Sequence, residues 1–316
     1  MKITLLVLTI STLLASIYFT LNRWERPANQ TKIVIATNTS REEITYAGNI
    51  RLSPDETTIE TISAGGFIRY KTNNTELKIK SDKGSVLTYS VNGKQYVKGV
   101  KPGQVEVVKE AISEMIAYGF DAAGRLERLR SKGGAPAVLA AIGPLKNDAI
   151  KQLYIQQLIS FGQLNDTARI QLIQQIAKLN ASHERAELLV SFPADQLKDS
   201  TVLDQWLITV AGLVSAPEKK LALQHLLGEN ILPQQGFDRA MAIIVSLLAD
   251  TEIVEMARLL MLKDVHTETQ WLALIDLAAT LTADQEKRRL LDLIAQQMPD
   301  NDNLIISWQN ANSYLK

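Results

Sequence analysis

Residues 176–184, Ile-Ala-Lys-Leu-Asn-Ala-Ser-His-Glu, decide the fold because the same pattern returns along the chain at a fixed distance. Residues 210–218 read Val-Ala-Gly-Leu-Val-Ser-Ala-Pro-Glu, and residues 244–252 and 278–286 repeat the pattern again. Residues 142–150 form a weaker first copy. Each copy begins 34 residues after the one before it, so the sequence predicts a tandem repeat.

The copies share apolar columns, which are positions that hold an apolar residue in every repeat. Four columns are spaced at i, i+1, i+4 and i+7, which is the spacing of one helical face, so they predict a helix that we call helix A. Their members are Val138, Leu172, Trp206, Ala240 and Leu274; Leu139, Ile173, Leu207, Met241 and Ile275; Ile142, Ile176, Val210, Ile244 and Ala278; and Leu145, Leu179, Leu213, Leu247 and Leu281.

A second set of columns follows a polar break and predicts a second helix, helix B, because its spacing of i, i+1 and i+4 again marks one helical face. Its members are Tyr154, Leu188, Ala222, Met256 and Leu290; Ile155, Leu189, Leu223, Ala257 and Leu291; and Leu158, Phe192, Leu226, Leu260 and Ile294. Each repeat is therefore predicted to be a helical hairpin. One hairpin buries too little apolar area to be stable alone, so we expect the hairpins to stack.

A column of glutamates occupies the first turn of helix B: Glu184, Glu218, Glu252 and Glu286. We interpret Ser182, Asp250 and Asp284, two residues earlier, as N-caps, and Ser215 with Glu218 as a capping box. A carboxylate at this end also suits the positive end of the helix dipole. The alternative is a ladder of acidic ligands for a metal or a basic partner.

Composition limits the possible partners. The chain has 34 basic and 34 acidic side chains, and this balance gives no overall electrostatic argument for nucleic acid or for an anionic membrane surface. Cysteine is absent, which excludes a disulfide framework, a thiolate nucleophile and a cysteine-based metal site.

An uncharged run begins at Ile3 and ends at Leu21, with Lys2 before it and Arg23 and Arg26 after it. Its length is close to what a helix needs to cross the hydrocarbon core of a bilayer. We interpret it as an uncleaved single-pass anchor that leaves the rest of the chain outside the cytoplasm. A signal peptide cleaved after Ala15 is the alternative.

Residues 32–99 change to a period of two, which predicts β-strands. Leu77 and Ile79 alternate with polar neighbours, and Asn92-Gly93 predicts a two-residue hairpin because both residues tolerate positive φ. We expect an antiparallel meander of roughly six to eight short strands. A helix should follow from about residue 105 to residue 119, with Val108 and Ile112 on its apolar face.

The segment 122–131 carries Arg125, Arg128 and Arg130, and Lys132 follows it. This cluster suggests phosphate or nucleic-acid binding, but it lacks interleaved aromatic residues, so we interpret it as a solvated helix face. Gly133-Gly134 and Pro136 should break the chain before the first repeat. The tail from residue 304 to residue 315 is predicted to be a shorter helix out of register with the columns.

No motif indicates catalysis. His183, His225 and His266 occupy different repeat positions, and no H-E-x-x-H, G-x-S-x-G or P-loop pattern is present. Trp206 belongs to a core column, so packing explains it better than ligand stacking. We therefore expect no enzyme activity, no catalytic residue, no metal and no cofactor.

Residues 47–53 and 62–68, Ala-Gly-Asn-Ile-Arg-Leu-Ser and Ile-Ser-Ala-Gly-Gly-Phe-Ile, resemble a poorly characterised family of bacterial envelope proteins. In that family an anchored β-region precedes helical repeats with turns like Ser182-His183-Glu184-Arg185. Related regions are attached to membrane metallopeptidases of the antibiotic-sensor type, but this chain has no zinc motif that would imply peptidase activity. The repeat length is also similar to that of tetratricopeptide repeats, whose residue signature the chain does not meet.

We therefore predict an α+β multidomain protein. Its parts are an N-terminal transmembrane helix or signal segment at 1–26, a small antiparallel β-meander domain at 30–101, a helical connector at 102–134, and a C-terminal α-solenoid of about five 34-residue hairpins at 135–316.

The functional hypothesis is a membrane-anchored scaffold of the bacterial cell envelope that binds a protein partner, and not nucleic acid, through its helical repeats. One position of helix B is mostly basic, with Ile253 as the exception, and is the candidate partner-binding column: Lys151, Arg185, Lys219 and Lys287. A solvated helix face is the alternative interpretation of this column. A ligand-sensing ectodomain that signals to a membrane partner is the alternative, and an envelope hydrolase with an unrecognised site is the third.

The anchor hypothesis predicts that the mature protein keeps its N-terminus and fractionates with membranes, because the run from Ile3 to Leu21 is long enough to span and lacks a good cleavage site. Mass spectrometry of the N-terminal peptide and membrane fractionation measure this. Soluble protein that begins near Ser16 would contradict it.

Overall fold

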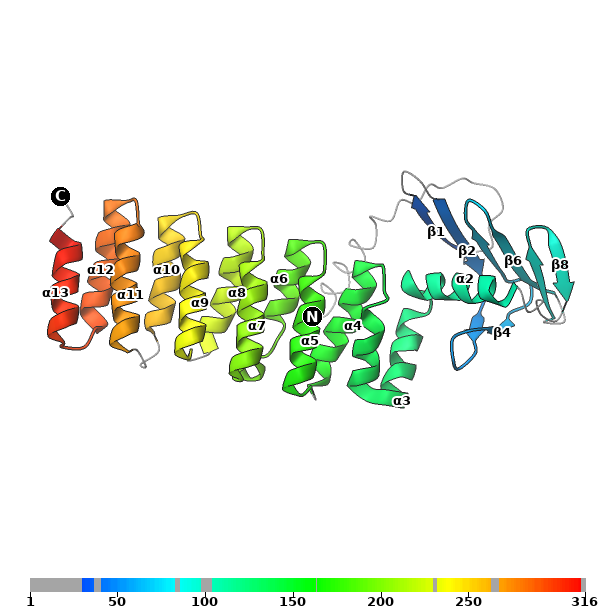
Figure 1. Ribbon diagram of the computed structural model, residues 1–316, viewed down its shortest axis with the longest axis horizontal. Coiled ribbons are helices and arrows are strands. Elements are labelled where there is room, and N and C mark those ends of the chain that lie inside the picture. Colours follow the sequence, from blue (N-terminus) through cyan, green and yellow to red (C-terminus); the bar gives the residue numbers. More distant parts are fainter. Residues whose placement is uncertain are drawn as a thin grey trace, which may run out of the picture. The chain divides into compact units, whose positions relative to one another are not determined.

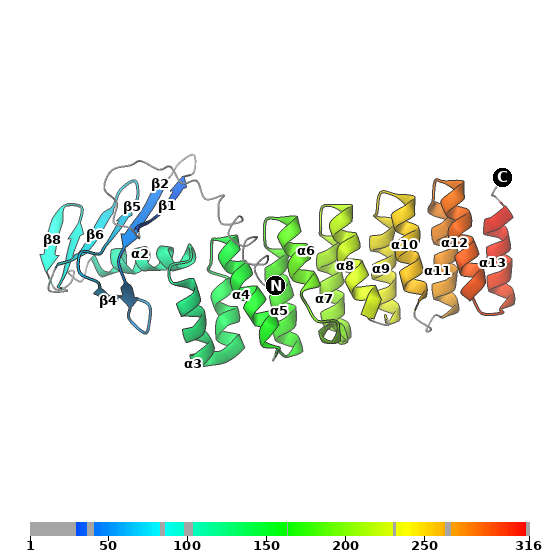
Figure 2. The same ribbon diagram turned by 180° about the vertical axis from the view of Figure 1, so that it is seen from behind.

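The computed structural model describes residues 30–36, 41–82, 86–97, 104–162, 164–229, 232–262 and 267–313 (Figures 1 and 2). The predicted anchor and His266 lie outside these residues. No described helix is both long and apolar enough to cross a membrane. The chain forms two compact units, which we treat separately. The first comprises the described residues up to Arg125 together with Pro144–Ile150, and the second comprises Leu126–Gly143 and the chain from Lys151 onward.

The first unit contains eight strands, and every strand pair is antiparallel. Six of them form one sheet in the order β1-β2-β5-β6-β7-β8, and β3 and β4 form a separate two-stranded sheet. The strands are β1 (Gln30–Ala36), β2 (Arg41–Ala47), β3 (Ile50–Leu52), β4 (Ile59–Ile62), β5 (Phe67–Lys71), β6 (Glu76–Ser81), β7 (Leu87–Val91) and β8 (Lys94–Val97).

The predicted Asn92-Gly93 hairpin is confirmed. Val91 pairs directly with Lys94 across the turn, and φ is 47° at Asn92 and 83° at Gly93. Positive φ at both central residues matches the right-handed twist of the two strands, which explains why these residue types are needed here.

The simple meander is interrupted, because β3 and β4 leave the main sheet between β2 and β5. Gly48 makes the departure possible with a φ of 91°. The base of the excursion is closed by two hydrogen bonds. Asn49 N–H donates to Ser63 Oγ at 3.0 Å, and Ser63 N–H donates to the Asn49 carbonyl at 2.9 Å.

Helix α2 (Val105–Ala117) packs against one face of the main sheet. Alternate strand residues such as Ile44, Leu77 and Ile79 meet Ile112 and Met115 in a core from which water is excluded. The period of two in the strands and the period of 3.6 in the helix therefore describe the two sides of one apolar layer.

The following helices are α3 (Ala122–Ile142), α4 (Asp148–Phe161), α5 (Asp166–Ala177), α6 (Ser182–Val190), α7 (Ser200–Ala211), α8 (Ala216–Glu229), α9 (Gln234–Val245), α10 (Asp250–Met261), α11 (Glu268–Thr280), α12 (Asp284–Gln297) and α13 (Asp302–Ser313), with a short 3-10 helix, η3, at Ala194–Leu197. Helix α3 bends at Gly134, where φ is 60°, so the predicted break is a kink followed by Pro136. From α5 onward the odd-numbered helices pack in one row and the even-numbered helices in another (Figure 1).

The helix boundaries repeat at the step predicted from the sequence. Helices α5, α7, α9, α11 and α13 each begin 34 residues after the previous member of their row, and so do α4, α6, α8, α10 and α12. Every member of the seven apolar columns is buried, which confirms the repeat register.

One column lies elsewhere than predicted. Leu179, Leu213, Leu247 and Leu281 follow the end of helix A, and their buried side chains fill the turn that leads into helix B. In each case the leucine N–H donates to the carbonyl three residues earlier. This tightened last turn keeps an i+7 residue on the apolar side after the α-helix has ended.

The prediction that the tail is out of register is wrong. Helix α13 is a further helix A, because it packs against α11 and begins 34 residues after it. Trp308 Nε1 donates to the Leu291 carbonyl at 2.8 Å, as Trp206 Nε1 donates to that of Leu189 at 3.1 Å. The register was hidden because polar, exposed Gln309 stands in a column that is apolar in earlier repeats.

Adjacent leucines provide a test of this register. Leu247 is 5% exposed and Leu248 is 91% exposed. Leu247→Ala should lower the free energy of unfolding by about 2–5 kcal/mol because it leaves a cavity, and Leu213→Ala should do the same. Leu248→Ala should change it by less than about 0.5 kcal/mol. Chemical denaturation of the full chain measures the differences, and equal effects at 247 and 248 would refute the register.

Candidate interaction surfaces

The N-caps of helix B differ from those predicted. Helices α6, α10 and α12 begin at Ser182, Asp250 and Asp284 themselves, and the capping positions are alanines that provide no side-chain hydrogen bond. The hydroxyl of Ser182 and the carboxylate of Asp250 instead form hydrogen bonds with another repeat.

Ser182 and Asp250 bind the turn of the following repeat. Ser182 Oγ accepts a hydrogen bond from Val214 N–H at 3.1 Å and donates to Glu218. Asp250 Oδ2 accepts from Thr282 N–H at 2.8 Å and from Ala283 N–H at 2.7 Å. These bonds lower the pKa of Asp250, the bond from Ala283 N–H most. Ser182 and Asp250, each the first residue of a helix B, thus link one repeat to the next.

Glu218 shows what the glutamate column does. Partial burial alone would raise its pKa, but hydrogen bonds from the Ser182 hydroxyl, the Ser215 hydroxyl and the Ser215 N–H together lower it. The contacts with Ser215 fit the capping box predicted from the sequence. We interpret this carboxylate as a structural group rather than a metal ligand.

The four basic candidates, Lys151, Arg185, Lys219 and Lys287, all lie half-buried at the fourth residue of a helix B. Arg185 Nη1 donates to the Gly212 carbonyl at 3.4 Å, and Lys219 Nζ donates to Ser246 Oγ at 3.1 Å. Both acceptors stand at the C-terminus of helix A in the following repeat, where a positive charge is favourable. The structure thus gives two of the four side chains a stacking role, and it brings them to the turns between helices A and B.

Those turns expose large apolar side chains. Val214 is 82% exposed and Leu248 is 91% exposed, and they occupy equivalent positions in adjacent repeats. Ile208 and Val245, near the ends of α7 and α9, are about half exposed. We call these four residues the turn edge. None of the four belongs to an apolar column, so the repeat pattern in the sequence does not predict this surface.

A shallow hollow of about 180 Å³ adjoins the turn edge. Ile208, Ala211 and Ala242 form its apolar wall, and Lys219 and Ser246 line it as well. Small-molecule sites commonly enclose about 300–1,000 Å³. The hollow is therefore better suited to a single side chain of a partner than to a whole ligand.

The first unit contains a buried tyrosine among carboxylates. Burial, and then the charges of Glu42, Glu110 and Glu114, raise the pKa of Tyr70 above its usual range. Lys146 Nζ lies 2.6 Å from Glu114 Oε1, and this contact raises the pKa of Lys146. Shifted pKa values often mark catalytic groups. Because the Tyr70 hydroxyl donates to Glu110 and Lys146 engages Glu114, we interpret the cluster as a contact that fastens α2.

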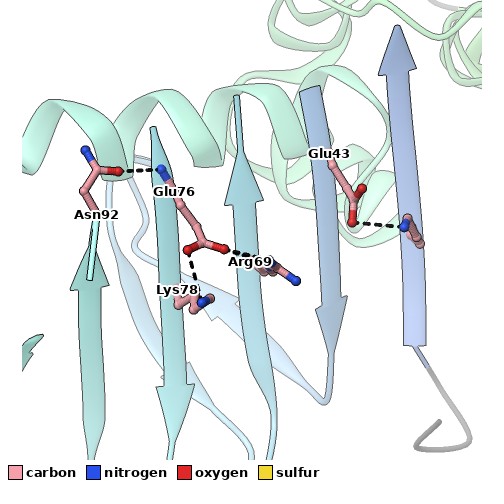
Figure 3. Close-up of polar contacts among 6 residues, drawn as sticks. Glu43, Arg69, Glu76, Lys78 and Asn92 are labelled. Atoms are coloured by element: carbon pink, nitrogen blue, oxygen red, sulfur yellow. Dashed lines mark hydrogen bonds and ion pairs between the residues drawn. The ribbon is translucent and has the colours of Figure 1, made fainter. Parts of the chain in front are cut away.

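The opposite face of the main sheet is strongly charged, and we call it the outer face. Arg69 Nη2 lies 2.7 Å from Glu76 Oε1, and Lys78 Nζ lies 3.1 Å from Glu76 Oε2 (Figure 3). Asn92 Oδ1 accepts a hydrogen bond from Glu76 N–H at 2.8 Å. The bond from Arg69 and the contact with Lys78 lower the pKa of Glu76, so this carboxylate is ionised at neutral pH.

The remaining candidate residues from the sequence are buried or contact other groups of the protein. Trp206 is fully buried, and His225 Nε2 lies 2.7 Å from the Phe192 carbonyl oxygen. Arg125 pairs with Glu56 at 2.9 Å, and the Arg130 guanidinium stacks 4.4 Å from the centre of the Phe161 ring. His183 is exposed and lies 3.2 Å from Glu187. Within the described part of the chain, no group of three or more histidine, aspartate or glutamate residues could hold a metal ion.

Comparisons of the chain with protein-family models, with curated proteins and with solved structures find no match.

Asp250 and Asp284 allow a matched test of the contacts between repeats. Both start a helix B, and of these two residues it is Asp250 that has side-chain hydrogen bonds to the next turn in the described part of the chain. Asp250→Ala should cost about 1 kcal/mol of unfolding free energy more than Asp284→Ala. Because the folded pKa of Asp250 lies below the ordinary aspartate value of 3.8, its contribution to stability is present above pH 3.8 and is lost as pH falls through the folded pKa. Denaturation at pH 7 and pH 3 measures both effects, and equal costs at pH 7 would contradict the assignment.

Proposed function

We propose that this protein is a non-enzymatic scaffold of the bacterial cell envelope, anchored by the run from Ile3 to Leu21. Its helical repeats form an α-solenoid that binds a protein partner along the turn edge. The observation that carries the proposal is the exposure of Val214 and Leu248 at equivalent positions of adjacent repeats. Stacking does not require apolar side chains there, and adjacent exposed apolar groups commonly mark an interaction site.

The partner chemistry follows from what surrounds the turn edge. Helices that pack side by side lie about 8–10 Å apart, so equivalent turn residues recur at roughly that distance. Arg185 and Lys219 reach the same turns from helix B. A partner segment that fits this edge carries apolar side chains for Val214 and Leu248 and acidic side chains for the basic column. Such a complex weakens as salt rises.

The test is site-specific photocrosslinking in intact cells, with the crosslinking amino acid placed at 214 or 248. The control position is Leu262, which is 55% exposed at the end of α10, on the edge where helix B ends. We expect one partner, identified by mass spectrometry, from 214 and 248 and not from 262.

A matched pair of variants completes the test. Val214→Asp with Leu248→Asp should reduce capture of that partner at least tenfold, because the charges oppose burial of the edge, while the melting temperature stays unchanged. Leu262→Asp should leave capture intact. Identical crosslinks from all three positions, or full capture by the double variant, would overturn the proposal.

A further inference from the structure

The outer face of the main sheet has an excess of positive charge that the whole chain lacks. The strand register places on it the alternate residues that point away from α2, such as Thr45, Arg69 and Lys78, which pair across β2, β5 and β6. Its charged side chains are basic at Lys32, Arg41, Arg69, Lys71, Lys78 and Lys80, and acidic at Glu43 and Glu76. The net charge of the chain is +0, so the basic residues of this face are concentrated locally.

Internal ion pairs account for only part of this charge. Glu43 engages Lys32 at 3.0 Å, and Glu76 engages Arg69 and Lys78. Lys71 and Lys80 are exposed and form no ion pair with a carboxylate among the described residues. Like charges on adjacent strands oppose folding slightly. Six basic side chains against two carboxylates leave the outer face with a net positive charge, which favours an anionic surface outside the chain.

Apolar side chains border the same face. Val34 on β1 is 45% exposed and Val97 on β8 is 67% exposed, and both register positions belong to the outer face. They are the exposed large apolar residues of the described first unit. Since β1 and β8 are the two edge strands, the basic centre is flanked by one apolar residue on each side. A soluble anionic ligand would make no apolar contact with these residues, whereas a lipid surface offers both headgroup charge and an apolar boundary.

We propose that the outer face docks on the surface of an anionic phospholipid bilayer. This inference rests on the proposed anchor. Only residues 22–29 separate the end of the apolar run from β1, and eight extended residues span at most about 30 Å. The tether keeps the sheet at a high effective concentration next to the bilayer, on the order of mM. Docking then requires only modest electrostatic attraction, which acts within about 10 Å at 0.1 M salt.

The experiment uses the full chain reconstituted in vesicles of phosphatidylcholine, with or without phosphatidylglycerol. The chain has no cysteine, so Gln95→Cys on the outer face takes a single environment-sensitive fluorophore. Accessibility of the label to acrylamide in water reports the docked fraction. We expect protection in vesicles that contain phosphatidylglycerol, loss of protection at high salt, and little protection in phosphatidylcholine alone.

Two double variants separate the outer face from overall charge. Each lysine near an anionic surface strengthens binding roughly fivefold, so Lys71→Glu with Lys80→Glu should lower the docking equilibrium at least about 25-fold. Lys94→Glu with Lys109→Glu makes the same change in net charge. Lys94 is exposed at a register position of the opposite face, and Lys109 lies on α2, so this control should dock like the parent.

The outcomes separate a failure of the docking inference from a failure of the proposed anchor. Flotation of the chain with pure phosphatidylcholine vesicles at high salt tests the anchor alone. If the chain does not float with these vesicles, docking is measured instead as its flotation with phosphatidylglycerol vesicles, which high salt should abolish. Equal label accessibility in both lipids, or equal loss of docking in both double variants, overturns the inference. Protection by added polyphosphate but not by phosphatidylglycerol also overturns it and assigns the face to an anionic polymer.

Discussion

The structure of the second unit depends on one constraint, which is that no 34-residue hairpin can bury its own apolar surface. Each repeat must be covered by the next, so the buried apolar columns recur from one interface to the following one. Polar contacts between successive repeats add to them at particular interfaces. Ser182 and Asp250 each bind the turn of the next repeat, and Arg185 and Lys219 each reach the end of its helix A. Helix α12, which lacks a side-chain cap of its own, receives such a bond at its N-terminus from Asp250.

This constraint also determines where the surface can vary. The column residues are committed to stacking and are buried throughout. The side chains that directly follow Leu213 and Leu247, those of Val214 and Leu248, face solvent and carry no packing requirement. Apolar side chains at Val214 and Leu248 therefore need a reason other than folding. The basic column has two roles, since a side chain that binds a neighbouring helix end still presents its charge at the turn.

In the first unit, successive side chains along each strand point to opposite faces of the sheet and so form two different surfaces. Residues such as Ile44 and Leu77 meet α2, and their neighbours Thr45 and Lys78 belong to the outer face. A one-residue shift of register would exchange the two sets, so the apolar core holds the charged face in place. The pairing of Glu76 with Arg69 and Lys78 limits repulsion on that face without neutralising it.

The sequence alone determined the repeat length, the two helices of each hairpin and the buried columns, because burial of one helical face imposes a period that is visible in a single chain. It also determined the Asn92-Gly93 hairpin, whose φ values few residues adopt. Tertiary structure decided the rest. Asp250 binds a turn 32 residues away, and a local pattern contains no information about such a partner. Helix α13 concealed its register because exposed, polar Gln309 occupies a position that is apolar in the earlier repeats. The exposure of Leu248 beside buried Leu247 likewise follows from where helix A ends in space, which periodicity alone does not specify.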